Sequence, residues 1–197
     1  MPAQFFFRGK MFSSENSYSP SDDSFLLAQA ITKAIGTCID MGCGCGIQAL
    51  NLLNNGAQRV ICVDISKKAL ATSEANCRLA GFAAQVETRK SDLFENVEEI
   101  ADVIVFNPPY VESEALEEKD LDGGMKGREV LDRFLEQMPQ HLDKKGVCYF
   151  LQTDINGYAE TKKMLGKLGF SCEIVATKKG FFEELAVFRA EKLQNGK

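Results

Sequence analysis

Short apolar runs alternate with longer segments of helical spacing along most of this 197-residue chain. This alternation predicts an α/β fold, with helices on both faces of a mostly parallel sheet. The last two apolar runs are joined by a link of hairpin length, so we expect the final pair of strands to be antiparallel. The predicted strands lie near residues 38–41, 59–63, 85–90, 103–106, 147–151, 171–177 and 183–189.

The N-terminal part of the chain is predicted to divide at about residue 17. Residues 1–17 are polar and aromatic with no clear period, which predicts an irregular arm before a single domain at 18–197. Ser21 is a candidate helix cap, because two acidic residues follow it in what would be the first turn. Apolar residues at helical spacing then continue as far as Ile35.

Composition narrows the class of protein. The chain is 45% hydrophobic and 26% charged, and no apolar run approaches the roughly 20 residues that span a bilayer. Its net charge of −5 argues weakly against nucleic acid as the sole substrate. Seven cysteines, several of them in apolar runs, predict reduced and buried thiols in a cytoplasmic protein. Cys43 and Cys45 form a C-x-C pair without a second pair of ligands, so no metal site is predicted.

A glycine-rich turn follows the first predicted core strand. Asp40 stands just before Gly42, Gly44 and Gly46, which lack the Cβ atoms that would keep a ligand away from the backbone. Such a turn alone is compatible with a dinucleotide, a phosphate or merely tight packing. The spacing is G-x-G-x-G, however, and not the G-x-G-x-x-G of dinucleotide sites. Asp40 would repel a pyrophosphate and attract a cationic sulfonium, so the chemistry favours S-adenosyl-L-methionine as cofactor.

Acidic residues also end the next two predicted strands. Asp64 follows the glycines by about 20 residues, where a carboxylate can accept both hydroxyls of a bound ribose. Asp92 can accept a hydrogen bond from an adenine amino group, with Leu93 packed against the ring. Each acid alone would more often be a surface residue of a turn, but together they place carboxylates at one edge of the sheet. Ser24 and Ile65 are further predicted cofactor contacts.

The sequence N-P-P-Y at residues 107–110 follows the apolar run 103–106. It therefore stands at the carboxyl end of a strand, where open α/β sheets hold their ligands. Two prolines remove two backbone donors and fix the direction of the chain, as they would in a simple proline-rich turn. The side-chain carbonyl of Asn107 and the main-chain carbonyl of Pro108 can each accept an N–H from a planar NH2 group. Asn107, Pro108, Pro109 and Tyr110 are the predicted catalytic residues, and Asn107 is also a predicted cofactor contact.

These motifs resemble class I S-adenosylmethionine-dependent methyltransferases. Within that superfamily the chain is similar to the HemK-related amino methyltransferases of the short archaeal and eukaryotic branch. The resemblance covers nearly the whole chain from about residue 17, and four segments support it: YSPSDDSFLL at 18–27, DMGCGCG at 40–46, NPPYV at 107–111 and GGMKGREVLDRF at 123–134. Leu121 and Asp122 stand where some relatives have Trp and Ala.

The resemblance implies a Rossmann-like, seven-stranded, mostly parallel sheet with an antiparallel last strand. It also implies methylation of the side-chain amide of a glutamine, in a Gly-Gly-Gln motif of a translation release factor. A small zinc-binding activator protein would be the partner in a heterodimer. Other acceptors stay open, namely the amino group of adenine or cytosine in DNA or RNA, and a protein lysine. A non-catalytic protein with a methyltransferase-like fold is the alternative that is not an enzyme.

Overall fold

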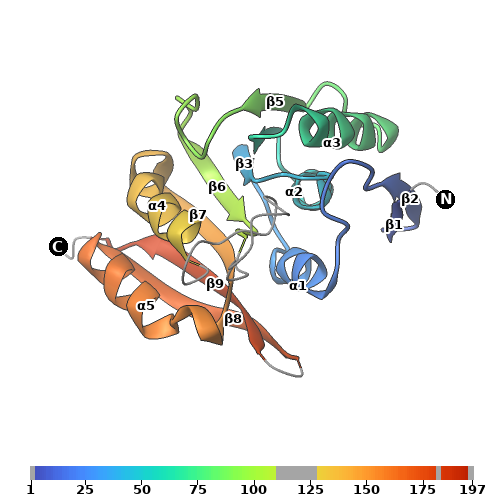
Figure 1. The fold of residues 1–197 in the computed structure, drawn as a ribbon. Coiled ribbons are helices and arrows are strands. Elements are labelled where there is room, and N and C mark those ends of the chain that lie inside the picture. Colours follow the sequence, from blue (N-terminus) through green and yellow to red (C-terminus); the bar gives the residue numbers. More distant parts are fainter. Residues whose placement is uncertain (1–2, 110–127, 181–182, 195–197) are drawn as a thin grey trace.

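The computed structural model describes residues 3–109, 128–180 and 183–194 (Figure 1). Two features predicted from the sequence lie outside these residues. One is Tyr110, the last of the predicted catalytic residues. The other is the polar stretch at 112–127, whose length and position after N-P-P-Y predict a loop beside the site.

The described part of the chain contains a seven-stranded sheet with the order β5-β4-β3-β6-β7-β9-β8. Strand β9 runs antiparallel to both of its neighbours, and the pairs from β5 across to β7 are parallel. This confirms the predicted fold class, including the antiparallel last strand. The strands are β3 (Thr37–Met41), β4 (Arg59–Asp64), β5 (Val86–Lys90), β6 (Ala101–Phe106), β7 (Leu142–Thr153), β8 (Phe170–Lys179) and β9 (Glu184–Lys192).

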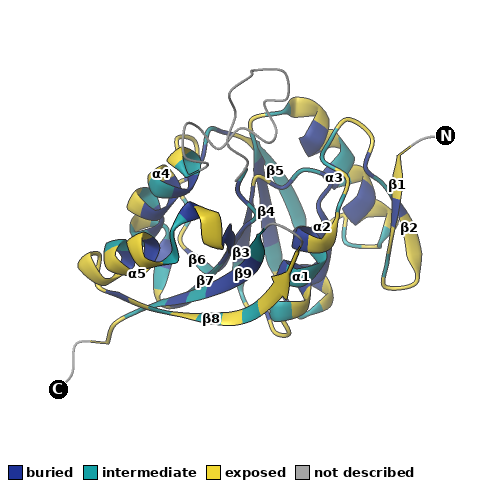
Figure 2. Ribbon diagram, turned by 60° about the horizontal axis from the view of Figure 1, so that its bottom comes forward, coloured by how far each residue is buried: buried dark blue, intermediate teal, exposed yellow. Residues whose placement is uncertain are grey.

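Helices cover both faces of the sheet, with α1, α2 and α3 on one side and α4 and α5 on the other (Figure 1). Side chains of a strand point alternately to its two faces, so each central strand supplies two hydrophobic cores. On β3, Cys38 packs with the cluster under α1 to α3, and Ile39 with the cluster under α4 and α5. Figure 2 shows the buried strands between the exposed outer faces of the helices. The helices are α1 (Asp22–Ala30), α2 (Ile47–Asn54), α3 (Lys67–Leu79), α4 (Glu129–Gln137) and α5 (Tyr158–Lys167), with short 3-10 turns at Met138–Gln140 and Asp154–Asn156.

Helix α1 is shorter than its sequence pattern predicted. It ends at Ala30, and Ile35 is exposed instead of lying on a helical face. The side-chain amide of Asn51 on α2 donates to the carbonyls of Ala28 (2.8 Å) and Ile31 (3.2 Å). These carbonyls lie at the C-terminal end of α1, where the last carbonyls of a helix lack their usual donors four residues on; the carbonyl of Ala28 also accepts the backbone N–H of the C-cap residue Ile31 (3.3 Å). A tertiary contact that local spacing cannot reveal therefore stabilises the end of the helix.

The prediction of an irregular N-terminal arm is wrong for residues 4–13. Strands β1 (Gln4–Phe7) and β2 (Lys10–Ser13) form an antiparallel hairpin. Phe5 and Phe12 lie opposite each other, are buried and join the hydrophobic core of the domain. The side chain of Asn76 on α3 hydrogen-bonds both the N–H and the carbonyl of the last residue of β2. The aromatic rings of Phe5 and Phe12 and the side-chain amide of Asn76 thus attach the hairpin to the domain.

The prediction that the cysteines are mostly buried is confirmed, since all seven belong to the described residues and six are buried, and none forms a disulfide. Only Cys172 is partly exposed. Among the described residues, no helix is long and apolar enough to cross a membrane.

Candidate functional site

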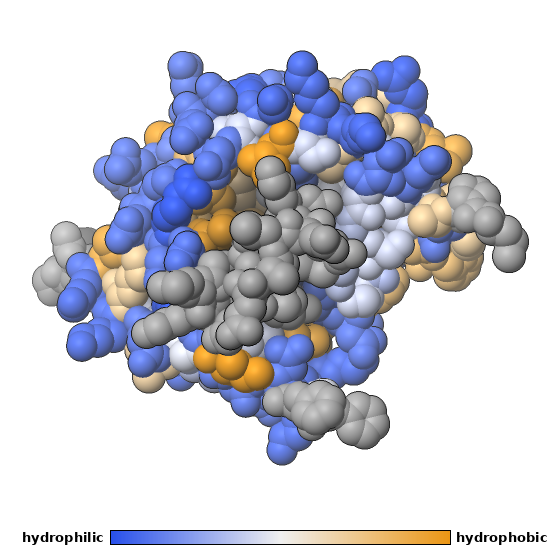
Figure 3. All heavy atoms as spheres, in the orientation of Figure 1, coloured by the Kyte–Doolittle hydropathy of each residue, from blue (hydrophilic) through white to orange (hydrophobic). Residues whose placement is uncertain are grey.

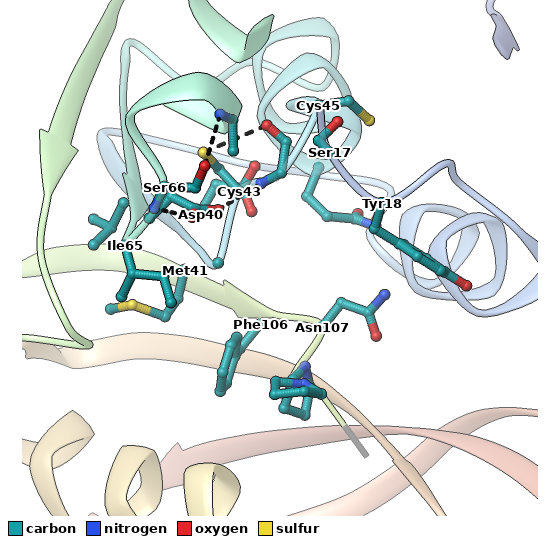
Figure 4. Close-up of a pocket in the computed structure, with 18 of the residues that line it drawn as sticks. Ser17, Tyr18, Asp40, Met41, Cys43, Cys45, Ile65, Ser66, Phe106 and Asn107 are labelled. Atoms are coloured by element: carbon teal, nitrogen blue, oxygen red, sulfur yellow. Dashed lines mark hydrogen bonds between the residues drawn. The ribbon is translucent and has the colours of Figure 1, made fainter. Parts of the chain in front are cut away.

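A cavity of about 310 Å³ opens at the carboxyl ends of the central strands. It collects side chains from the segment before α1, from the ends of β3, β4 and β6, and from α4. In Figure 4, Asn107 extends from the end of β6 toward the segment that carries Tyr18, and the glycine-rich loop lies across the cavity. The predicted site residues that line it are Ser24, Asp40, Gly42, Gly44, Asp64, Ile65, Asp92, Leu93, Asn107, Pro108 and Pro109.

Gly46 does not line the cavity. It is the N-cap of α2 with a φ of 82°, and an added Cβ would lie 2.5 Å from the hydroxyl oxygen of Ser73 on α3. Gly44 differs, because its φ is 51° and an added Cβ would meet no atom within 4 Å. Both positions have a left-handed backbone conformation, which glycine adopts without steric strain. Gly46 also allows close packing of two helices, whereas Gly44 leaves open space beside the backbone.

Asp64 holds the glycine-rich loop in place. One carboxylate oxygen accepts a hydrogen bond from the backbone N–H of Gly44 (3.0 Å), and the other from that of Ser66 (2.8 Å). Each carboxylate oxygen can accept more than one hydrogen bond, so the group can still take a hydroxyl from a ligand. The carboxylate thus joins the end of β4 to the loop after β3.

Asp40 lies deeper and is 1% exposed. Its carboxylate accepts a hydrogen bond from the backbone N–H of Ala49 (2.9 Å), in the first turn of α2. Burial raises the pKa of Asp40 well above its ordinary value, and the hydrogen bond from Ala49 only partly opposes this effect. A nearby cation would favour the ionised carboxylate, so the site is electrostatically suited to a positively charged ligand.

Asp92 is paired with a residue that the sequence analysis did not identify. Its carboxylate lies 2.8 Å from the guanidinium of Arg133 on α4, which also lines the cavity. The next residue, Leu93, is buried and has a φ of 47°, a conformation that is uncommon for a residue other than glycine. Strained backbone of this kind often occurs at ligand sites.

Two amide side chains have buried carbonyl oxygens without a hydrogen-bond partner. Among the described residues, the buried side-chain oxygens in this state are those of Asn107 and Gln48, and both residues line the same cavity. The NH2 group of Asn107 donates to Asp23 (3.0 Å), and that of Gln48 donates to the carbonyl of Ser24 (2.8 Å). Buried polar atoms are almost always hydrogen-bonded, so two exceptions in one cavity indicate a site completed by a ligand.

Asp23, Gln48 and Arg133 are charged or amide residues of the site that the sequence did not reveal. Asp23 was assigned to the first turn of a helix, although the sequence segment that supported the family resemblance includes it. Gln48 and Arg133 lie in helical segments whose periodicity marks only their apolar faces. The predicted cap also differs, because Ser21 makes no side-chain cap of α1 and instead donates to Asp23 (2.8 Å).

Known proteins are similar to this chain in both sequence and fold. The methyltransferase small domain family model matches residues 8–182. A relative from Methanocaldococcus jannaschii is 38% identical over 183 residues, covering 89% of this chain and 92% of that protein. Its name, protein N5-glutamine methyltransferase MJ0928, is itself a prediction. The human methyltransferase HEMK2 is 29% identical over 191 residues, covering 89% of each chain.

A solved structure extends this similarity. The E. cuniculi Mtq2–Trm112 complex is described as responsible for methylation of the translation termination factor eRF1. It superimposes with a TM-score of 0.68 at 25% identity, covering 89% of this chain and 98% of the matched one. The chain therefore belongs to the methyltransferase small domain family, among the HemK-related class I methyltransferases.

Proposed function

We propose that this chain transfers a methyl group from S-adenosyl-L-methionine to the side-chain amide nitrogen of a glutamine. We further propose that this glutamine belongs to a Gly-Gly-Gln motif in a translation release factor. The name of the Methanocaldococcus jannaschii relative and the activity described for the E. cuniculi complex support this substrate. The observation that carries the proposal is the buried, unpartnered carbonyl oxygen of Asn107 at the end of β6.

The residues of the cavity fit this cofactor. Its ribose hydroxyls, adenine amino group, sulfonium and ammonium all favour hydrogen-bond acceptors or negative charge. Asp64 and Asp92 would hold the nucleoside, and Asp40 would favour the cationic end. The unpartnered oxygen of Gln48 is an acceptor that a donor on the amino-acid part would satisfy. When bound, the cofactor supplies an electrophilic methyl group.

The glutamine amide of the substrate would lie at the corner formed by Asn107 and Pro108, where the carbonyl oxygen of Asn107 is a hydrogen-bond acceptor. A buried acceptor without a partner costs about 1–3 kcal/mol, and an N–H of the incoming amide would remove that cost. The main-chain carbonyl of Pro108 is the second acceptor in this hypothesis. An amide nitrogen is a poor nucleophile, because its lone pair is delocalised. Two carbonyl oxygens on its N–H groups orient the nitrogen and favour positive charge developing on it, which is catalysis by positioning and electrostatics.

A partner subunit is part of the proposal. The E. cuniculi neighbour was solved as a complex with Trm112, which supports a small activator subunit, and the family resemblance suggests that it binds zinc. Nucleic acid is not the proposed substrate, because a chain with a net charge of −5 has no overall basic character. A cytoplasmic location, and a division between residues 1–17 and 18–197, stay predictions.

Mass spectrometry tests the proposed function. The chain, with and without the activator, is incubated with a release factor and cofactor carrying a deuterated methyl group. We expect one labelled methyl on the Gly-Gly-Gln glutamine, and none when that glutamine is replaced by alanine. Parallel reactions contain DNA, RNA and lysine-rich protein. Label found on adenine, cytosine or lysine, with none on the glutamine, would overturn the proposal.

A further inference from the structure

The geometry points to Asp23 as a positioning residue that sets the orientation of the Asn107 side chain, an inference that rests on the proposed function. The Asn107 amide nitrogen lies 3.0 Å from one carboxylate oxygen of Asp23. An ionised carboxylate only accepts hydrogen bonds, so only the NH2 end of Asn107 can face it. The carbonyl end is therefore turned away from Asp23, and this is the oxygen that is buried without a partner.

Asp23 is itself held firmly. It is 2% exposed, and its other oxygen accepts hydrogen bonds from the hydroxyls of Ser24 (3.1 Å), Ser21 (2.8 Å) and Tyr18 (3.3 Å). The backbone N–H of Ser24 donates to the same oxygen. Rotation of the carboxylate would break several of these bonds together. The first turn of α1 and the segment before it thus fix a group that belongs to the end of β6.

This orientation matters because the two ends of a carboxamide have nearly the same shape. A flipped Asn107 would present N–H groups to the N–H groups of an incoming amide, and donors facing donors repel. Asp23 selects the orientation that offers a carbonyl oxygen to the acceptor. Its loss should therefore affect turnover more than cofactor binding.

The first test compares Asp23→Asn with Asp22→Asn. Both variants remove one negative charge from neighbouring positions, but Asp22 is exposed and pairs with Lys178 at 2.8 Å. A catalytic group displaced by about 1 Å can cost roughly a hundredfold in rate, so we expect a kcat loss of that order for Asp23→Asn. We expect calorimetry to show little change in cofactor affinity, and Asp22→Asn to keep the wild-type kcat. Weaker cofactor binding with an unchanged kcat would overturn the proposal, because Asp23 would then be a ligand contact.

The second test needs neither the protein substrate nor catalytic turnover. The side-chain amide signals of Asn107 are identified by NMR through their absence in Asn107→Ala. In the wild type we expect slow exchange of these protons with solvent, and in Asp23→Asn fast exchange and shifted signals. Unchanged signals in Asp23→Asn would overturn the inference. If the wild type methylates no glutamine, the proposed function fails, while this spectrum still decides whether Asp23 holds Asn107.

A swapped pair gives a control for folding. Asn107→Asp places two carboxylates face to face, which we expect to lower the melting temperature. In the double variant D23N/N107D, the new amide at position 23 can donate to the new carboxylate at position 107. We expect the double variant to regain much of the lost melting temperature. Additive losses would show that the two side chains are not coupled.

Discussion

Single residues in the cavity combine structural and ligand-binding roles. Asp64 accepts two backbone N–H groups and Asp40 accepts one, so both carboxylates hold the loop around the glycines as well as facing the cavity. Asn107 differs, because its carbonyl oxygen has no partner. Alanine substitutions of the aspartates should therefore disturb both the loop and the ligand, whereas substitution of Asn107 should act mainly on the chemical step.

Asn107→Ala should abolish turnover while cofactor binding largely survives. Loss of one hydrogen bond directed at the transition state costs roughly 3–4 kcal/mol, which is a hundredfold or more in rate. Single-turnover methylation of the release factor and calorimetric titration of the cofactor measure the two effects separately. Asn54→Ala, on the exposed side of α2, is the control. A variant that kept near-full activity would disprove the role of Asn107.

Asp64→Ala should weaken cofactor binding by about ten- to a hundredfold, because hydrogen bonds to a charged group contribute about 1.5–3 kcal/mol. The effect of Asp92→Ala should be smaller, since Asp92 is about half exposed and already pairs with Arg133. Asp64→Asn keeps one side-chain oxygen that can accept a hydrogen bond from the loop but removes the negative charge. Comparing it with Asp64→Ala therefore separates the support of the loop from the binding of the ligand. Calorimetry that gave wild-type affinity for the Asp64→Ala variant would contradict the ribose assignment.

Asp40 should make cofactor binding depend on pH. A raised pKa means that folding disfavours the ionised carboxylate, so its contribution to stability is present below about pH 4 and is lost as the pH rises. A cationic ligand binds the ionised form better, so wild-type affinity should fall as the pH is lowered. Asp40→Asn should leave the free energy of unfolding at neutral pH unchanged or higher, while lowering affinity and its pH dependence. Calorimetry with the same pH dependence in both proteins would exclude this explanation.

Secondary-structure elements bring these residues together through parallel pairing. Neighbouring parallel strands end at the same edge, so Asp40 on β3, Asp64 on β4 and Asn107 after β6 meet although they are far apart in the chain. Helix α4 closes the cavity from the other face with Arg133. Its first turn is anchored by Arg128, whose guanidinium bonds Asp132 and the carbonyls that precede α5.

Arg128→Ala should destabilise the fold at the start of α4. Its side chain is 13% exposed, and its partners include the carbonyl of Gly157 at 3.0 Å. We expect the free energy of unfolding to fall by about 2–3 kcal/mol, because charged hydrogen bonds are lost from a partly buried place. Arg78, which is 67% exposed and pairs with Glu74, is the matched control. Removing such a surface pair should cost less than about 1 kcal/mol. If urea unfolding gave the same loss of unfolding free energy for the Arg128 and Arg78 variants, Arg128 would not anchor the start of α4.

At the scale of the whole molecule, the N-terminal hairpin and the sheet edges remain available for contacts. Phe5 and Phe12 face the core, whereas Phe6 and Met11 lie opposite each other on the outer face and are 62% and 51% exposed. Figure 3 shows hydrophobic side chains gathered at the edge of the molecule where this hairpin lies. In the described sheet, β5 and β8 each pair with a single strand, so each presents an unpaired edge that can accept a strand from a partner.

We expect the isolated chain to be poorly soluble or weakly active, and co-expression with a small zinc-binding activator to improve both. The physical reason is that exposed apolar side chains and open strand edges favour association. The yield of monodisperse protein and the rate of glutamine methylation, with and without the activator, measure the effect. A stable monomer with full activity, unchanged by the activator, would show that no partner is needed.

The fold class, the strands of the main sheet and several residues that line the cavity could be predicted from the sequence. This was possible because hydrophobic period and turn chemistry are local, and because parallel strands must end at a common edge. The prediction of Asp64 and Asn107 in one cavity needed only that rule.

The partners of these groups could be identified only from the folded structure. That the side chain of Asn107 faces Asp23, that α1 stops at Ala30, and that Phe5 and Phe12 fold back onto the core all depend on contacts between distant segments. Local propensity is weak compared with burial and with the cost of an unpaired buried polar group. The final orientation of each side chain was therefore set by its neighbours in space.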